Sequence, residues 1–244
     1  MKRLSIILLA ALVFGGVLIA RLPAAWVVPA LRPDLSCTRI SGSIWSGECT
    51  GVRVRGVALD QLAWRVHPHA LLHGLLSAQL TALRGTASAS GEVSMGWHGP
   101  VRGRALQVRL ALEPALVPIL PPYITGTLEA DIARIEVARN GTIERLQGRL
   151  TVRHLIDSSG QVTPLGNFAV TFPPGPGEPV GQLRDLGGPL SLTGTVRLTA
   201  QPGYVLRAEL AARAGAAPSL VQALQYLGAP DAEGRRPFAL AGTY

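Results

Sequence analysis

The sequence predicts a mainly β protein: an N-terminal transmembrane helix followed by an antiparallel, meander-like β-sheet or sandwich with one or two short helices. Two observations carry this prediction. An uncharged run of seventeen residues, Leu4 to Ala20, follows two basic residues at the start of the chain. Beyond residue 34, apolar residues alternate with polar residues or glycine, and this period of two is typical of half-buried strands.

The apolar run is long enough to predict a membrane span. Seventeen helical residues measure roughly 26 Å, slightly less than a bilayer core, and Arg21 can extend its guanidinium to the interface. Lys2 and Arg3 precede the run, which places the N-terminus in the cytoplasm. We therefore predict a single-pass inner-membrane protein, with a cytoplasmic tip (1–3), a transmembrane helix (4–22), a stem (23–34) and a β-rich periplasmic domain (35–244).

A cleaved signal peptide is the alternative interpretation of the same segment. The basic start and apolar middle fit it, but the Arg-Leu-Pro-Ala-Ala-Trp sequence after the run has no clean small-x-small cleavage site. We prefer the uncleaved anchor. Both interpretations deliver the rest of the chain to the same compartment, and the sequence leaves open whether the segment is ever cleaved.

The charge of the chain argues against nucleic acid as a partner. The 244 residues carry a formal net charge of +8, and Lys2 is the sole lysine. The arginines occur singly along the predicted strands, without the basic cluster that nucleic-acid-binding proteins use. We interpret these arginines as residues of a solvated sheet face. Their positive charge would support a weak attraction to anionic lipid headgroups.

Strand patterns recur along the whole chain. In residues 101–112, Leu106 and Val108 lie on one face and Gln107 and Arg109 on the other. Glycines precede several such patterns and are expected to open strands after a turn or bulge; these are Gly91, Gly126, Gly148 and Gly194. The succession of strands favours an antiparallel meander over βαβ units.

Turn and helix signals complete the expected architecture. Asn140-Gly141 separates two strand patterns, which predicts a type I′ hairpin turn. Short helices are expected over residues 68–76, beginning at Pro68, and over residues 218–227, with Gly228 after the end. The segment from Phe172 to Gly188 is rich in proline and glycine and is expected to be an exposed loop or linker.

Two cysteines, Cys37 and Cys49, follow the export signal closely. An oxidising compartment favours a disulfide between them. The residues between them read as strand, turn and strand, so the bridge would close a small loop and contribute about 2–3 kcal/mol. The spacing excludes a CxxC redox site, and no second pair supports a metal site.

The sequence contains no motif that predicts catalysis. His67, His69 and His73 invite a metal interpretation, but no cysteine or carboxylate nearby completes a ligand set, so we read them as solvated or packed residues. There is no nucleophile elbow, phosphate loop or dinucleotide fingerprint. Three tryptophans, Trp45, Trp64 and Trp97, are expected to anchor the core. We therefore predict no enzyme activity, no metal and no cofactor.

Several segments together resemble a known family. They are Gly42-Ser-Ile-Trp-Ser-Gly47, Leu62-Ala-Trp64 followed by Pro68-His-Ala-Leu-Leu-His-Gly74, and the ending from Leu224 to Phe238. With one N-terminal anchor, this order resembles protein N of the type II secretion system, the general secretion pathway protein N family. The residues that mark the resemblance are expected to be structural: Gly42, Trp45, Gly47, Trp64, Gly74, Leu227, Gly228, Pro230, Asp231, Gly234 and Phe238.

The resemblance implies an accessory inner-membrane component of a Gram-negative machine that exports folded proteins across the outer membrane. The implied partners are the inner-membrane platform and the periplasmic part of the secretin, and the family supplies no catalytic residues. Exposed edge strands would suit contacts by strand addition.

Two further hypotheses stay open at this point. Long antiparallel sheets behind an anchor also resemble the AsmA-like envelope proteins, whose apolar β-groove would bind or move lipid. A periplasmic enzyme with dispersed residues is the weaker one. The sequence sets no oligomeric state.

Overall fold

The computed structural model describes residues 21–31, 35–54, 57–113, 121–175 and 177–243. The chain divides into two compact units, residues 1–85 and 86–244, which are described separately. Both are built mainly from antiparallel β-strands with short helices, as the sequence predicts.

Unit 1 is a small sheet centred on two long strands. Strand β3 pairs with β4 on one side and with the short strands β1 and β2 on the other, and β4 continues to β5. The elements are α2 (Ala24–Leu31), β1 (Leu35–Ser36), β2 (Arg39–Gly42), β3 (Ser46–Val54), β4 (Val57–Val66), α3 (Pro68–Leu71) and β5 (Leu75–Arg84).

Unit 2 is a meander in which each strand pairs antiparallel with the next. Its elements are β6 (Ala87–Gly96), β7 (Val101–Ala111), β8 (Ile124–Val137), β9 (Ile143–Asp157), β10 (Thr163–Phe172), β11 (Val180–Asp185), β12 (Leu190–Leu198), β13 (Tyr204–Ala212), α4 (Pro218–Gln225) and β14 (Arg236–Gly242). Because each strand pairs antiparallel with the next, the prediction of an antiparallel meander is confirmed. Helix α4 interrupts the meander before its last strand.

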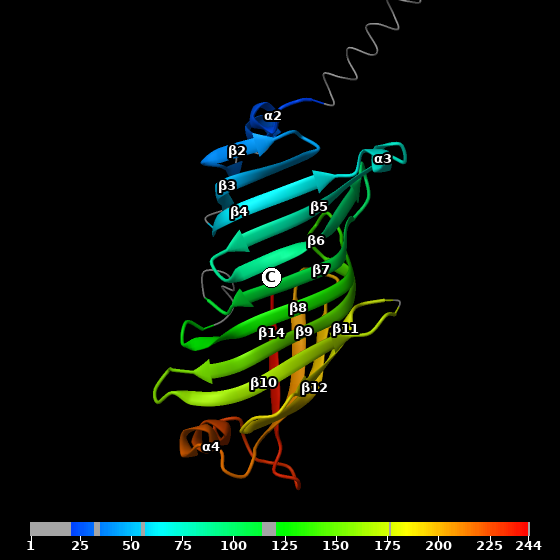
Figure 1. Ribbon diagram of the computed structural model, residues 1–244. Helices are drawn as coiled ribbons and strands as arrows, with labels where there is room; N and C mark the ends of the chain where they lie inside the picture. The colour runs from blue at the N-terminus through cyan, green and yellow to red at the C-terminus, as the bar shows by residue number, and fades with distance from the viewer. Residues whose placement is uncertain (1–20, 32–34, 55–56, 114–120, 176, 244) are drawn as a thin grey trace, which may run out of the picture. The chain divides into compact units, whose positions relative to one another are not determined.

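The sheet of unit 2 curls back on itself. In Figure 1 the strands β11, β12 and β14 lie behind β7–β10, so one face of the sheet is turned inward and the other outward. The predicted alternation in β7 matches these faces: Leu106 and Val108 are half-buried, whereas Gln107 and Arg109 are exposed. We call the two sides the inner face and the outer face.

Glycines inside the strands allow this curvature. At Gly148 the backbone has a φ of +157°, and a Cβ would lie 2.7 Å from Ile132 Cα on the neighbouring strand. At Gly194 a Cβ would lie 2.6 Å from Ala208 Cα. The expectation that Gly91, Gly126, Gly148 and Gly194 open strands is wrong, because all four lie within strands. The expected association with bulges holds for Gly91 and Gly126, where the strand register shifts. Close backbone approach in a bent sheet also requires glycine.

The turn between β8 and β9 differs from the expected type I′ turn. Such a turn needs two residues with positive φ, but among residues 138–142 this holds for Gly141 alone, at +90°. The Gly141 N–H donates to the Ala138 carbonyl oxygen (3.0 Å), and the Ala138 N–H donates to the Thr142 carbonyl oxygen (2.8 Å). The connection is therefore longer than a two-residue turn, with Gly141 in its left-handed position.

Of the other local predictions, those of the helix starts are confirmed, whereas that of a loop over residues 172–188 is wrong. Helices begin at Pro68 and Pro218 as expected, and Gly228 follows α4 with a φ of +100°. The segment 172–188 is not a loop throughout, because strand β11 forms inside it and pairs with both β10 and β12. The short helix α2, within the predicted stem, was not expected.

The predicted transmembrane helix cannot be compared with the structure. Most of the predicted span 4–22, namely residues 4–20, and the cytoplasmic tip 1–3 lie outside the described residues. Within the described ranges, no helix combines the length and the apolar character needed to cross a bilayer.

Candidate functional site: the inner face and the free edge of unit 2

The inner face of unit 2 carries aliphatic side chains in register across several strands. Leu106 on β7 lies opposite Ile132 on β8, and Val108 lies opposite Ala130, which in turn faces Leu150 on β9. Most of these side chains are only half-buried, although Ala130 is buried. Among the described residues, Val52 and Cys49 of unit 1 are the largest side chains that are fully buried. The inner face of β7–β9 is therefore apolar without being closed.

One end of the inner face is closed by helix α4. Leu220 and Leu224 of α4 pack with Phe168 of β10, Leu190 of β12 and Leu210 of β13, and each of these side chains is at most 8% exposed. Helix α4 presents one apolar stripe, since residues four apart lie on the same helix face. This cluster joins β10 to β12 and β13 through α4 and so holds the curled end of the sheet together.

An aspartate stabilises the turn beside this closed end. Asp185 accepts hydrogen bonds from Arg213 Nη2 (2.5 Å) and from the backbone N–H groups of Gly187 (3.1 Å) and Leu192 (3.2 Å). Burial raises the pKa of the Asp185 carboxyl, but these donors lower it further, so its pKa lies below the ordinary value. The carboxylate is thus held in its charged form at neutral pH.

Strand β14 presents a free edge, since within the described chain its strand partner is β13 alone. The Thr199 N–H donates to the Gly203 carbonyl (3.0 Å), so odd-numbered residues of β13 form their backbone hydrogen bonds with β12. Even-numbered residues of β13, such as Leu206 and Ala208, therefore direct their backbone N–H and C=O groups toward β14. Residues 237, 239 and 241 therefore direct their backbone groups away from β13. Pro237 fits this position, because proline has no N–H to donate to a ladder.

The side chains along this edge offer little protection against pairing. From residue 237 to 242 no side chain is charged, and Ala239, Leu240 and Ala241 are exposed. Natural edge strands are usually shielded by charges, bulges or a covering segment. Apart from Pro237, this edge has none of the side-chain devices, which makes it a candidate docking edge for another strand.

The motif residues of unit 1 form one structural group. The Trp64 Nε1–H donates to the Ser43 carbonyl (3.3 Å), and Trp64 lies opposite Gly47 in the register of β3 and β4. A Cβ at Gly47 would lie 2.6 Å from the Trp64 ring, so glycine is needed for the indole to cover the turn. Gly42 has a φ of +90°, and Trp45 is half-buried in the same turn.

Gly74 and the C-terminal motif residues shape connections. Gly74, with a φ of +68°, follows α3 and leads into β5. Asp231 Oδ1 accepts from the N–H groups of Glu233 (3.0 Å) and Arg235 (2.7 Å), and Oδ2 accepts from Arg235 Nε (3.0 Å). The backbone N–H of Arg235 is the main cause of the lowered pKa of Asp231. Gly234 has a φ of +77° in this turn.

The remaining motif residues lie around the closed end. Leu227 and Phe238 pack against the α4 cluster, and Pro230 is exposed between Gly228 and the Asp231 turn. Arg235 Nη1 also lies 2.9 Å from Glu209 Oε2 on β13, which ties the Asp231 turn to the sheet. These residues position β14 rather than forming a reactive centre.

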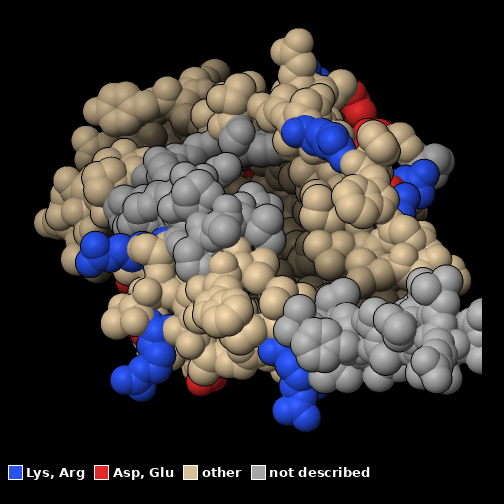
Figure 2. Space-filling view, turned by 90° about the horizontal axis from the view of Figure 1, so that it is seen from above, with Lys and Arg blue, Asp and Glu red and all other residues tan. Residues whose placement is uncertain are grey.

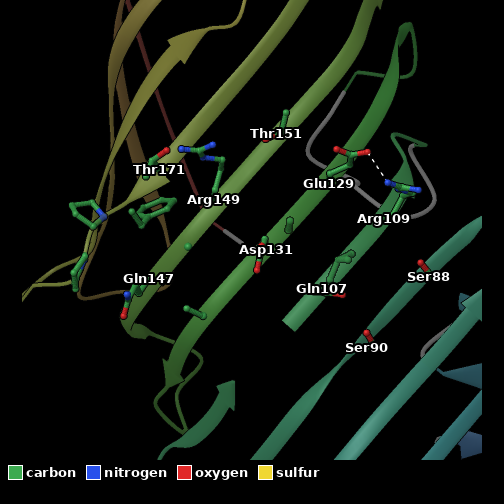
Figure 3. Close-up of a pocket in the computed structure, with 17 residues that line it drawn as sticks. Ser88, Ser90, Gln107, Arg109, Glu129, Asp131, Gln147, Arg149, Thr151 and Thr171 are labelled. Atoms are coloured by element: carbon green, nitrogen blue, oxygen red, sulfur yellow. Dashed lines mark hydrogen bonds and ion pairs between the residues drawn. The ribbon is translucent and has the colours of Figure 1, made fainter. Parts of the chain in front are cut away.

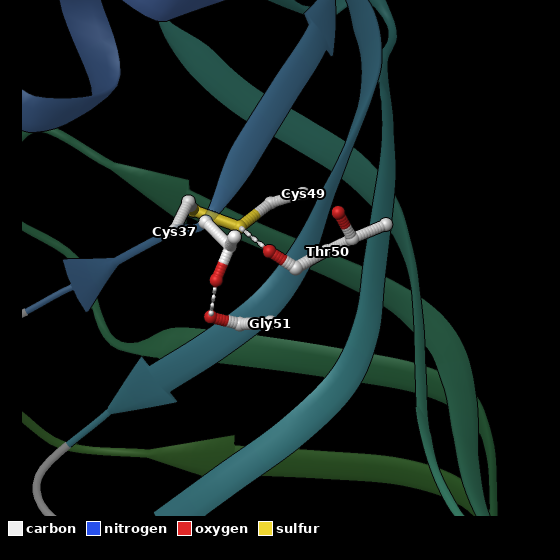
Figure 4. The surroundings of a disulfide bond; sticks show 5 residues. Cys37, Cys49, Thr50 and Gly51 are labelled. Atoms are coloured by element: carbon white, nitrogen blue, oxygen red, sulfur yellow. Dashed lines mark hydrogen bonds between the residues drawn. A yellow bond between two sulfur atoms is a disulfide. The ribbon is translucent and has the colours of Figure 1, made fainter.

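The predicted disulfide is present. Cys37 and Cys49 are bonded, with their Cα atoms 5.8 Å apart (Figure 4). The Thr38 N–H donates to the Thr50 carbonyl (2.9 Å) beside it, so the bridge joins β3 to the segment that precedes β2. Gly51 has a φ of +61°, and a Cβ there would overlap the Thr38 side chain.

The histidines and one tryptophan stand apart from these groups. His67 precedes α3, His69 lies in it and His73 follows it, and the ring centroids of His67 and His69 are 5.7 Å apart. Within the described ranges, no three His, Cys, Asp or Glu side chains gather as a metal site would require. The expectation that Trp97 anchors the core is wrong, because its side chain is 82% exposed.

The arginines are dispersed as predicted. On the face shown in Figure 2, the basic side chains stand singly and are separated by uncharged residues. On the outer face of unit 2, Glu136 lies between Arg102 and Arg145 (3.6 Å each), and Glu129 lies between Arg109 (3.0 Å) and Arg153 (2.9 Å). These two Arg–Glu–Arg groups cross β7, β8 and β9.

Comparison with known proteins identifies the family. The family model described as "Type II secretion system (T2SS), protein N" matches residues 33–239. The chain belongs to this family. The match includes the disulfide, the tryptophan group of unit 1 and nearly all of unit 2, so the resemblance drawn from the motif residues is confirmed.

Curated relatives of the family agree with this match. The type II secretion system protein N of Aeromonas hydrophila is 25% identical over 237 residues, which cover 93% of each chain. The protein of the same name from Vibrio cholerae is 37% identical over 73 residues, which cover 29% of each chain. No solved structure matches the chain.

Proposed function

We propose that this protein is an accessory component of the type II secretion system that supports export of folded proteins from the periplasm across the outer membrane. The family match over residues 33–239 is the observation that carries this proposal. The proposed topology is an inner-membrane anchor at residues 4–22, with residues 1–3 in the cytoplasm, residues 23–34 as a stem and residues 35–244 in the periplasm. We propose no catalytic role.

The proposed contacts are made by strand addition at β14. Its outward N–H groups, on Ala239 and Ala241, and the outward carbonyl groups of residues 237, 239 and 241 form a ladder that complements an extended strand. The partner is proposed to be another secretion component, either of the inner-membrane platform or the secretin. The motif residues of the Asp231 turn would serve this function by fixing where β14 begins.

A matched pair of substitutions tests the edge. Ala239→Pro removes an outward N–H and leaves the bonds between β13 and β14 in place, whereas Ala239→Val keeps that N–H and adds a side chain suited to strands. Native membranes in mild detergent would be used for affinity purification, with quantification of named secretion subunits. We expect Ala239→Pro to lose these subunits and Ala239→Val to retain them. Equal recovery with both variants would contradict docking at this edge.

A second candidate function rests on the inner face. Aliphatic side chains in register and half-exposed, such as Leu106, Val108 and Leu150, are the lining expected of a groove that binds acyl chains. A fluorescent fatty acid would test this with the purified protein. Binding that is lost in Val108→Glu and kept in Gln107→Glu would support it, since Gln107 lies on the outer face. No binding by the unmodified protein would contradict it.

A further inference from the structure

The outer face of unit 2 contains a hollow of about 950 Å³. Among its lining residues, Val108 and Ala130 also belong to the apolar rows of the second candidate function. It crosses β6 to β10, from Ser88 and Ser90 at one side to Thr171 at the other (Figure 3). Four gaps between five strands make it about 19 Å long. A ligand for it would be elongated and would lie across the strands.

Polar side chains line this hollow in rows that follow the strand register. One row joins Ser90, Gln107, Asp131, Arg149 and Thr171, each opposite the next on the neighbouring strand. We call it the middle row. It lies between the Arg109–Glu129–Arg153 group and the Arg102–Glu136–Arg145 group described above.

The middle row differs from its neighbours because its charged groups have no partners. Asp131 and Arg149 face each other in the register, yet within the described chain neither side chain makes an ion pair or hydrogen bond. In Figure 3 the Arg149 side chain extends toward Thr171 and away from Asp131. The Thr171 hydroxyl is buried and has no hydrogen-bond partner among the described residues.

The flanking rows show that the sheet can satisfy such charges. Glu129 is bonded on both sides, and the hydrogen bond from Arg153 is the main cause of its lowered pKa. A carboxylate, a guanidinium and a hydroxyl left open side by side are therefore a local exception. Toward one space, the carboxylate offers hydrogen-bond acceptors, the guanidinium offers donors, and the hydroxyl can donate or accept.

The lining indicates the chemistry of the ligand. Two arginines, Arg109 and Arg149, balance Glu129 and Asp131, so the hollow favours neither a polyanion nor a polycation. Its described aromatic ring, Phe172, is 5% exposed, so the hollow offers no open aromatic face on which a flat cofactor could stack. Small apolar residues such as Ala130, Ala133 and Pro173 lie among the polar groups and suit the C–H faces of a sugar. Amide and hydroxyl side chains such as Gln107 and Ser88 are also part of the lining.

We propose that this hollow binds a hydroxyl-rich, uncharged oligosaccharide chain. Neighbouring sugar hydroxyls donate to the Asp131 carboxylate and accept from the Arg149 guanidinium, a pairing that a carboxylate and a guanidinium each make with two hydrogen bonds. An extended peptide is less suitable, because peptide strands are recognised at sheet edges and this site is a sheet face. In the envelope, such a chain would attach the secretion component to a glycan polymer.

The test uses N-acetylglucosamine oligomers as the probe, with the full-length protein in detergent and titration calorimetry. We expect saturable binding that becomes about tenfold weaker in Asp131→Ala and in Arg149→Met, since hydrogen bonds to charged groups are the stronger ones. The control is Glu136→Ala, which alters a charge on the same face outside the hollow and should bind as the unmodified protein does. Thermal unfolding checks that all variants are folded.

Three results would overturn the proposal. These are absence of binding to the unmodified protein, equal weakening by the Glu136→Ala control, and preference for an extended peptide over the oligomers. Each is independent of β14, so recovery of secretion subunits in the Ala239 experiment neither supports nor contradicts the glycan site.

Discussion

The two ends of the inner face of unit 2 are built from the same kinds of side chain but are covered differently. At the α4 end, Leu220, Leu224 and Phe168 are buried in one cluster. Along β7–β9, residues such as Leu106 and Val108 stay half-exposed. An apolar pattern in a strand therefore does not say whether its face becomes core. The covering element, here a helix of eight residues, decides it.

The largest expected effect sharpens this comparison at its closed end. Leu224→Ala should lower the free energy of unfolding by about 2–5 kcal/mol, because it leaves a cavity in the α4 cluster. Val221→Ala on the same helix is the control, since Val221 is 42% exposed and should cost well below about 1 kcal/mol. Urea denaturation measures both. Similar values for the two variants would mean that α4 does not close the sheet.

The next effect concerns unit 1, which is closed by a covalent bond instead of a helix. Replacing both Cys37 and Cys49 with alanine should lower the free energy of unfolding of unit 1 by about 3 kcal/mol, the value expected for a loop of this length. Adding reductant to the unmodified protein should reproduce the loss. Ready thiol labelling of the native protein without reductant would show that the bridge is not formed.

A smaller effect is expected at the turn beside the closed end. Asp185→Asn should cost about 1–3 kcal/mol at neutral pH, because Arg213 and two backbone N–H groups lose a charged acceptor. The folded pKa of Asp185 is lowered, so its contribution is present above the unfolded pKa of about 3.9 and is lost as pH falls through the folded value.

Denaturation as a function of pH measures this contribution. The difference between Asp185→Asn and the unmodified protein should shrink below about pH 4. Glu144→Gln, an exposed change on β9, is the control and should show no comparable dependence. A constant difference across the whole range would contradict the assignment to the Asp185 carboxylate.

The smallest effect is expected at the open end. Val108→Ala should cost about 1 kcal/mol or less, because a half-exposed side chain loses little contact with its surroundings. The measurement is the same urea denaturation as for Leu224→Ala. A cost equal to that of Leu224→Ala would break the comparison, since it would show that β7–β9 are packed as tightly as the α4 cluster.

The strand pattern could be predicted because alternation is a local property of the sequence. The period of two gave the faces of β7 correctly, and the proline and glycine signals placed α3 and α4. The positions of Gly148 and Gly194 within strands could not be foreseen, because the close approach that requires them comes from neighbouring strands. The strand β11 was missed because its two partners stabilise it despite flanking prolines and glycines.

The site was predictable only in part. The motif residues were found from the sequence, and the structure shows them shaping turns around Trp64 and Asp231. The free edge at β14 depends on which strand ends the sheet, and the open charges of Asp131 and Arg149 depend on pairing across strands. Neither signal exists within a short stretch of sequence, so both required the register.

Pro237 has a consequence for how the protein behaves at high concentration. If two copies joined through β14 in antiparallel pairing centred on Ala239, each Pro237 would face Ala241 of the other copy, and two hydrogen bonds would be missing. A foreign strand at the same edge loses only one. The difference, about 1 kcal/mol, biases the β14 edge against pairing with a second copy of the chain while the edge stays open to other strands.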